Sequence, residues 1–158
     1  MLPPPPSARA TTEQIAALLD AAAGLWSEPS PLERNGAHAG YRQALVVAGG
    51  VVRIPEAVPL LAPFDPVREA WLSWIDPGGL VVEHIDAGPH FERWQVQLSD
   101  CGALIQRGER CRPGVGEAFR VQHDDWHAVE NNDPGPRVVL VVDRDVLVSA
   151  TKSPFVRR

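Results

Sequence analysis

The sequence predicts a mainly β domain preceded by one clear helix. From residue 80 onwards, short runs rich in β-branched and aromatic residues alternate with turns that contain Gly, Pro, Asn and Asp. Apolar residues recur at helical spacing most clearly in one stretch, close to the N-terminus. Many short strands at this spacing are typical of a sandwich or a barrel, and jelly rolls are among the options.

The predicted helix begins at Thr11, which forms a capping-box pattern with Gln14 three residues later. Ile15 and Leu18 then start an apolar stripe at helical spacing, and Gly24 is expected to end the helix. We expect this helix to cover a sheet. Residues 1–10 contain four consecutive prolines and are expected to be a disordered leader, with residues 11–158 forming a single domain.

The strands are expected at short ranges that lie between turn signals. They are residues 43–47 and 51–54, forming a hairpin, and then 80–85, 94–98, 103–106, 118–122, 127–130 and 138–142. Residues 27–40 and 55–66 are rich in Pro or Gly and are expected to be irregular. The 138–142 run is apolar throughout, so both of its faces should be covered. Residues 65–75 fit either a helix or a tryptophan-rich strand, which Pro77-Gly78-Gly79 would end.

Composition excludes some classes of partner. The net charge is −5, the charges are mixed along the chain and no basic stripe exists, so neither nucleic acid nor an anionic membrane is expected as a partner. The apolar runs are too short to span a bilayer, and the N-terminus lacks the features of a signal peptide, which favours a cytoplasmic protein. Cys101 and Cys111 are expected to remain unpaired thiols, because a cytosolic chain keeps thiols reduced.

The motif His84-Ile85-Asp86 is the first candidate for chemistry. Alternate residues of a strand share a face, so His84 and Asp86 should point the same way while Ile85 enters the core. His127, which follows after a gap of forty residues, is the best candidate for a third ligand. Two histidines and one carboxylate can bind one face of Fe(II) and leave the other face open. Each motif alone is weak, because a His-x-Asp pair also occurs by chance on protein surfaces.

Arg137 strengthens the prediction of a site, because it lies where a buried apolar run begins. An arginine in such a place is rarely without an anionic partner. The partner is either a carboxylate of the chain, Asp143 or Asp145, or the carboxylate of a ligand, which the guanidinium could clamp with two parallel hydrogen bonds. Combined with the metal ligands, Arg137 leads to the hypothesis of an Fe(II)- and 2-oxoglutarate-dependent oxygenase.

The order and spacing of these features resemble those of the aspartyl/asparaginyl β-hydroxylase-like 2-oxoglutarate oxygenases. The resemblance covers roughly residues 73–143. It runs through Ser73-Trp74-Ile75-Asp76-Pro77-Gly78, His84-x-Asp86, Arg93, Leu98, Gly116-Glu117-Ala118-Phe119, His127-Ala128-Val129, Asn131 or Asn132, Arg137-Val138-Val139-Leu140 and Asp143. It implies a double-stranded β-helix, jelly-roll and cupin-like, with the N-terminal helix packed on the sheet. It also places residue 73 on a strand, which favours one helical turn followed by a strand in residues 65–75.

The resemblance implies a role for each matching residue. His84 and His127, with Asp86, would bind iron, whereas some members of the family have glycine in place of the carboxylate. Arg137 and Ser73 would bind the distal carboxylate of 2-oxoglutarate, and Arg93 would lie near its other end. The family often has histidine two residues after this arginine, and here Gln95 stands in its place as a further candidate for binding the co-substrate.

The activity implied is hydroxylation, with O2, of an unactivated C–H bond in a small molecule or a peptide, most simply an amino acid side chain. Trp126, His90 and His123 are the candidates for contacting the substrate. One alternative is a cupin-type metalloenzyme, an isomerase or a dioxygenase, that does not use 2-oxoglutarate. Gly116, His127 and Asn131 loosely fit the second cupin motif, although its Pro-x-Gly element is missing. A jelly roll that binds a ligand without catalysis is the third possibility.

Overall fold

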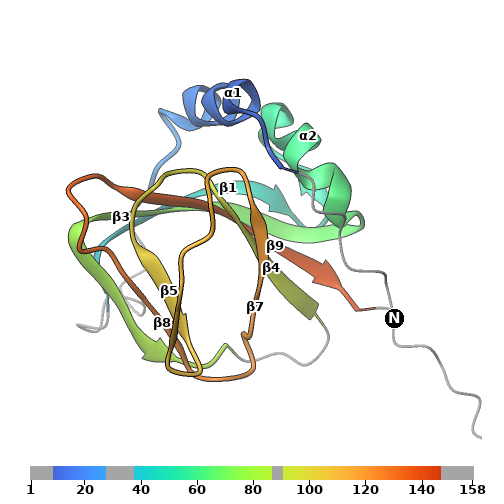
Figure 1. The fold of residues 1–158 in the computed structure, drawn as a ribbon. Coiled ribbons are helices and arrows are strands. Elements are labelled where there is room, and N and C mark those ends of the chain that lie inside the picture. Colours follow the sequence, from blue (N-terminus) through green and yellow to red (C-terminus); the bar gives the residue numbers. More distant parts are fainter. Residues whose placement is uncertain (1–8, 28–37, 87–90, 147–158) are drawn as a thin grey trace, which may run out of the picture.

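The computed structural model describes residues 9–27, 38–86 and 91–146, which form a curled antiparallel sheet with helices on its outer face (Figure 1). The strands are β1 (His38–Ala48), β2 (Val51–Val52), β3 (Val67–His84), β4 (Phe91–Gln97), β5 (Ala103–Gln106), β6 (Glu109–Cys111), β7 (Ala118–Val121), β8 (His127–Glu130) and β9 (Arg137–Asp145). Their order is β6-β5-β8-β3-β9-β4-β7, and β1 pairs with β2 and β3. The prediction of a mainly β, jelly-roll chain with an N-terminal helix is therefore confirmed.

Strand β3 connects the two sides of the curled sheet. Its first part pairs with β9 and its second part with β8, and β1 pairs along both parts. Two predictions about this stretch are wrong. Residues 65–75 contain no helical turn, because the strand already begins at Val67, and Pro77-Gly78-Gly79 bends the strand without ending it. Pairing continues across the bend because the Gly78 N–H donates to the Asn131 carbonyl, and the Asn131 N–H donates to the Gly79 carbonyl.

The main apolar core lies between the outer face of the sheet and the helices. Helix α1 (Thr12–Ala22) has the predicted capping box between Thr11 and Gln14. It packs beside three short helical turns, η1 (Pro55–Ala57), α2 (Val58–Leu61) and η2 (Ala62–Phe64). The prediction that 55–66 is irregular is thus wrong. Each turn has a proline in its first positions, where the missing N–H has no helical partner to lose.

Strand β9 shows how the two faces of the sheet differ. Val138, Leu140 and Val142 point outward into the helix-covered core, whereas Arg137 and Val141 line a cavity on the inner face. Every residue of β9 except the last is buried, which confirms that both faces of the 138–142 run are covered. The larger apolar core thus lies under the helices, whereas the inner face combines polar groups with a smaller apolar cluster of Ile75, Val81, Leu104, Val121 and Val129.

The hairpin and the two cysteines agree with the predictions, whereas the start of β1 and the presence of β6 do not. The hairpin of β1 and β2 forms, but β1 begins within the stretch expected to be a loop, and β6 was not predicted. Cys101 and Cys111 are unpaired, as expected. Among the described residues, no helix has the length and apolar content needed to cross a bilayer. The predicted leader, residues 1–8, and the C-terminal tail from residue 147 lie outside the described residues.

Asn131 fixes the corner between β3, β8 and β9. It is fully buried, and its side-chain amide donates to the carbonyls of Ile75 (3.0 Å) and Gly135 (2.8 Å). Its own side-chain oxygen accepts from the Asp133 N–H. These bonds satisfy backbone groups on both sides of the bend, so they hold the start of β9 against β3.

We expect Asn131→Ala to lower the free energy of unfolding by about 2–4 kcal/mol, because it removes the donor from the buried Ile75 carbonyl and from the part-buried Gly135 carbonyl. Urea denaturation measures the change. Asn132→Ala is the matched control, since this neighbour is exposed, and it should have little effect. Equal stabilities of the two variants would contradict the role given to the buried amide.

Candidate metal centre

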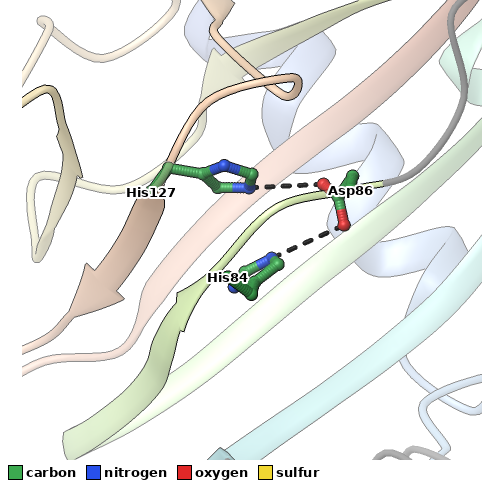
Figure 2. Close-up of side chains that lie close together, drawn as sticks. All are labelled: His84, Asp86 and His127. Carbon is green, nitrogen blue, oxygen red and sulfur yellow. Dashed lines mark ion pairs between the residues drawn. The ribbon is translucent and has the colours of Figure 1, made fainter.

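His84, Asp86 and His127 place three donor atoms within 4.8 Å of one another (Figure 2). The two histidines are directly paired across strands β3 and β8, and their rings lie 4.3 Å apart. Asp86 faces both rings, with its Oδ1 3.5 Å from His84 Nε2 and its Oδ2 3.2 Å from His127 Nε2. The structure therefore brings together the three residues that the sequence selected as metal ligands.

The reason for this convergence differs from the predicted one. Strand β3 ends at His84, so Asp86 does not share a strand face with it, and Ile85 is 46% exposed and not part of the core. Asp86 is positioned instead by its backbone N–H, which donates to the His123 carbonyl at 2.9 Å. The position of the Asp86 main chain is therefore set by contact with the segment around His123, and not by alternation along a strand.

Both imidazoles are oriented as metal ligands require. His84 Nδ1 donates to the Val82 carbonyl at 2.7 Å, and His127 Nδ1 donates to the Asp125 carbonyl at 2.9 Å. Because a carbonyl only accepts, each bond places the proton on Nδ1, and Nε2 is the nitrogen that faces the carboxylate. A backbone carbonyl on the second ring nitrogen is the usual support of a ligating histidine, so this donor set fits a divalent cation.

Charge complementarity further couples these groups. Burial alone would raise the pKa of Asp86, but hydrogen bonding to His127 and the charge of Arg93 outweigh it and lower this pKa below its usual value. Burial alone would lower the pKa of His127, but the hydrogen bond with Asp86 and the backbone bond to Asp125 raise it. The carboxylate is therefore ionised at neutral pH, as a metal ligand must be.

The three candidate ligands line a cavity of about 650 Å³ on the inner face of the sheet. Four other residues selected from the sequence line the same cavity, namely Ser73, Arg93, Gln95 and Arg137. Neither Trp126 nor His123 does: Trp126 is 54% exposed, and the His123 ring is buried with its Nε2 donating to the Phe91 carbonyl. His90 lies outside the described residues.

Arg137 is buried in this cavity without a carboxylate partner. It is 1% exposed, its Nη2 donates to Gln95 Oε1 at 2.9 Å, and its Nε has no hydrogen-bond partner. Within residues 9–27, 38–86 and 91–146, no carboxylate forms an ion pair with it: Asp143 pairs with Arg93, and Asp145 lies near Arg68. Burial lowers its pKa to about 10, so it still carries a full charge at neutral pH.

Gly102 makes room for this arginine, and the sequence analysis missed it. A Cβ on Gly102 would lie 2.4 Å from Arg137 Cδ, and the backbone there has a φ of +70°. The position follows an ordinary Ser-Asp turn signal in the sequence, which gives no hint of a distant contact. Tyr41, Gln43 and Trp71 were also missed; they line the cavity from β1 and β3.

Comparison with solved structures assigns the fold to the cupin-type double-stranded β-helix. A Thermotoga maritima protein described as a predicted oxalate decarboxylase matches with a TM-score of 0.56 and 16% identity over 79% of this chain and 96% of its own. A cupin-2 domain protein of Rhodospirillum rubrum matches with a TM-score of 0.54 and 10% identity over 77% and 70% of the two chains. No family model and no curated protein matches the sequence. At these identities the likeness establishes the fold alone.

We expect His127→Ala to weaken binding of Co(II), a probe for divalent cations, by more than about 100-fold, since losing even an outer partner of a ligand costs 10–100-fold. Isothermal titration calorimetry under anaerobic conditions measures this affinity. Trp126→Ala is the control, because this side chain is 54% exposed and lies outside the cavity, and it should retain the wild-type affinity. Equal Co(II) affinities of the wild type and His127→Ala would argue against this centre.

We expect Gly102→Ala to destabilise the fold by about 1–3 kcal/mol, because the added methyl overlaps the Arg137 side chain. Thermal unfolding measures the loss. Gly49→Ala is the comparison: it has a φ of +53° but nothing within 4 Å of a Cβ, so it carries the backbone strain without the overlap. Equal losses in both variants would show that the contact with the arginine is unimportant.

Proposed function

We propose that this protein is a cupin-type metalloenzyme that acts on a small organic carboxylate. The observation that carries the proposal is that a cluster of metal-ligand type and a buried, unpaired arginine line the same cavity. In the proposal, His84, Asp86 and His127 hold a divalent cation, and Arg137 binds the carboxylate.

The metal half of the proposal rests on the donor set. Two neutral imidazoles and one carboxylate suit Fe(II) and related divalent ions, and such a set leaves coordination positions open. The bound cation would supply Lewis-acid or redox chemistry at those positions. The protein's part is to hold the imidazoles through their Nδ1 bonds to backbone carbonyls and to keep Asp86 ionised.

The carboxylate half rests on an energetic argument. Burying a guanidinium without a counter-charge lowers the stability of the fold, so proteins rarely keep one unless a bound ligand supplies the counter-charge. Arg137 has donors left over after its bond to Gln95, and its Nε is buried and unpaired. A carboxylate can accept two parallel hydrogen bonds from such a fork, each charge-assisted.

An Fe(II)- and 2-oxoglutarate-dependent hydroxylase is the second candidate. In it the bound carboxylate would belong to 2-oxoglutarate, and the substrate would be an amino acid or a peptide side chain oxidised with O2. The position of Arg137, ten residues after His127 and on the same cavity wall as Ser73 and Gln95, favours it. Arg93 does not favour it, since its guanidinium is engaged by protein carboxylates.

We expect Arg137→Met to weaken carboxylate binding while leaving the unliganded protein as stable as the wild type, or more stable. The loss in affinity should be about 10–150-fold, because one to two charge-assisted bonds contribute roughly 1.5–3 kcal/mol. Replacing an unpaired buried charge by an apolar side chain of similar size is often neutral or stabilising. Calorimetry of the Co(II)-loaded protein with oxalate, pyruvate, succinate and 2-oxoglutarate, together with urea denaturation, measures both quantities.

An Arg137→Met variant that unfolds at much lower urea than the wild type would identify this arginine as a structural residue. The 2-oxoglutarate candidate has its own test in anaerobic titration of the Fe(II)-loaded protein with this acid. A weak visible charge-transfer band supports it. Binding of other carboxylates with no such band leaves the broader metalloenzyme proposal in place and eliminates this co-substrate.

A further inference from the structure

Arg93 is held on the cavity wall by an unusually complete set of contacts. It lies directly opposite Asp143 in the ladder of β4 and β9. Its Nε and Nη2 donate to the two carboxylate oxygens of Asp143 at 2.8 and 2.9 Å, which is a bidentate pair. Its guanidinium also lies over the Trp71 ring, 4.9 Å from the centroid, and near the Phe91 ring at 5.2 Å.

These contacts leave Nη1 of Arg93 to reach Asp86. Nη1 donates to Asp86 Oδ2, the oxygen that also faces His127. The other oxygen, Oδ1, lies on the side of His84. Both side chains of the pair are largely buried, 15% exposed for Arg93 and 10% for Asp143. A rigid, buried fork thus holds one oxygen of the candidate metal ligand.

We propose that the Arg93–Asp143 pair is the positioning device of the metal centre and sets its affinity by fixing the carboxylate of Asp86. This inference rests on the proposed function, because it takes the three-residue cluster to be a metal site. Asp86 needs such a device because it follows the end of β3 and has no ladder partner of its own. Its backbone N–H donates to the His123 carbonyl, which fixes the main chain but not the direction of the carboxylate.

The sign of the charges explains why two residues are required. Arg93 alone would hold Asp86 in place but would also repel a divalent cation a few ångströms away. Asp143 cancels that charge, so the pair is neutral and keeps the directional hydrogen bond without the repulsion. Burial lowers the pKa of Arg93, but the bonds to Asp143 more than compensate and raise it, so the guanidinium stays charged.

The same two strands offer a matched control. Glu92 and Arg144 are directly opposite in the same ladder, one position away, and form their own ion pair at 2.7 Å. Because successive residues of a strand point to opposite faces, this pair lies on the other face of the sheet from the cavity. Loss of its charge should therefore leave the metal site unaffected.

Anaerobic titration with Co(II) tests the inference, read by calorimetry and by the visible spectrum of the bound ion. We expect Asp143→Asn to weaken binding about 10–100-fold, the usual effect of removing a partner of a metal ligand. Arg93→Lys should weaken it as well, because a lysine retains the charge but cannot contact both carboxylates as a fork. At saturating Co(II), both variants should show a spectrum that differs from the wild type. Glu92→Gln should match the wild type in affinity and spectrum.

The outcomes separate this inference from the proposed function. A wild type that binds no Co(II) removes the metal centre and the inference together. A wild type that binds Co(II), with Asp143→Asn and Arg93→Lys unchanged in affinity and spectrum, overturns the inference alone. An equal loss of affinity in Glu92→Gln also overturns it, because the effect would then be a general one of charge removal from these strands.

Discussion

The unpaired charge of Arg137 is the constraint on which the rest of this structure depends. A guanidinium on the inner face prevents the sheet from closing on an apolar interior, so the sheet encloses a cavity that is partly polar. The inner face keeps only a smaller apolar cluster, which includes Leu104 and Val129. The larger apolar core lies on the outer face, where α1 and the turns of residues 55–64 bury the apolar side chains of β1, β3 and β9. The cavity and the larger core therefore lie on opposite faces of one sheet.

The bend in β3 brings residues from both ends of this strand to the cavity that contains Arg137. The strand forms one wall of the cavity beside β9 and then crosses to β8, so Ser73 and His84 belong to one continuous element that visits both sides (Figure 1). The corner is fixed by Asn131, and β9 begins with Arg137 just beyond it. The candidate ligands and the arginine are therefore positioned by the same few backbone contacts, which makes their relative placement rigid. A single small molecule can contact both a metal ion and an arginine only if the protein holds the two at a fixed separation.

Local patterns in the sequence predicted much of this architecture, and long-range contacts account for what it could not. The capping box of Thr11 and the apolar run of β9 depend on neighbours in sequence, so both were predicted correctly. The grouping of His84, Asp86 and His127 was also predicted, but its cause was not, because the contact between Asp86 and the His123 carbonyl joins segments 37 residues apart. Continuation of β3 through Pro77-Gly78-Gly79 was missed for the same reason. The proline and two glycines predict a turn at this point, and it is the pairing with β8 that continues the strand.

The partners of the two cavity arginines were the least predictable feature. Asp143 seemed an available counter-ion for Arg137, yet register places it opposite Arg93, and the choice depends on which strands are neighbours. That choice leaves one arginine satisfied by the protein and the other one available to a ligand. A sequence reports the number of charges, whereas strand order decides which of them are paired.

Anomalous diffraction from crystals grown with Mn(II) and a small dicarboxylate tests the central claim most directly. The account predicts an anomalous peak between His84, Asp86 and His127, and a carboxylate bound to the guanidinium of Arg137 in the same cavity. A manganese ion bound elsewhere, or an Arg137 side chain paired with a carboxylate of the protein, would contradict it.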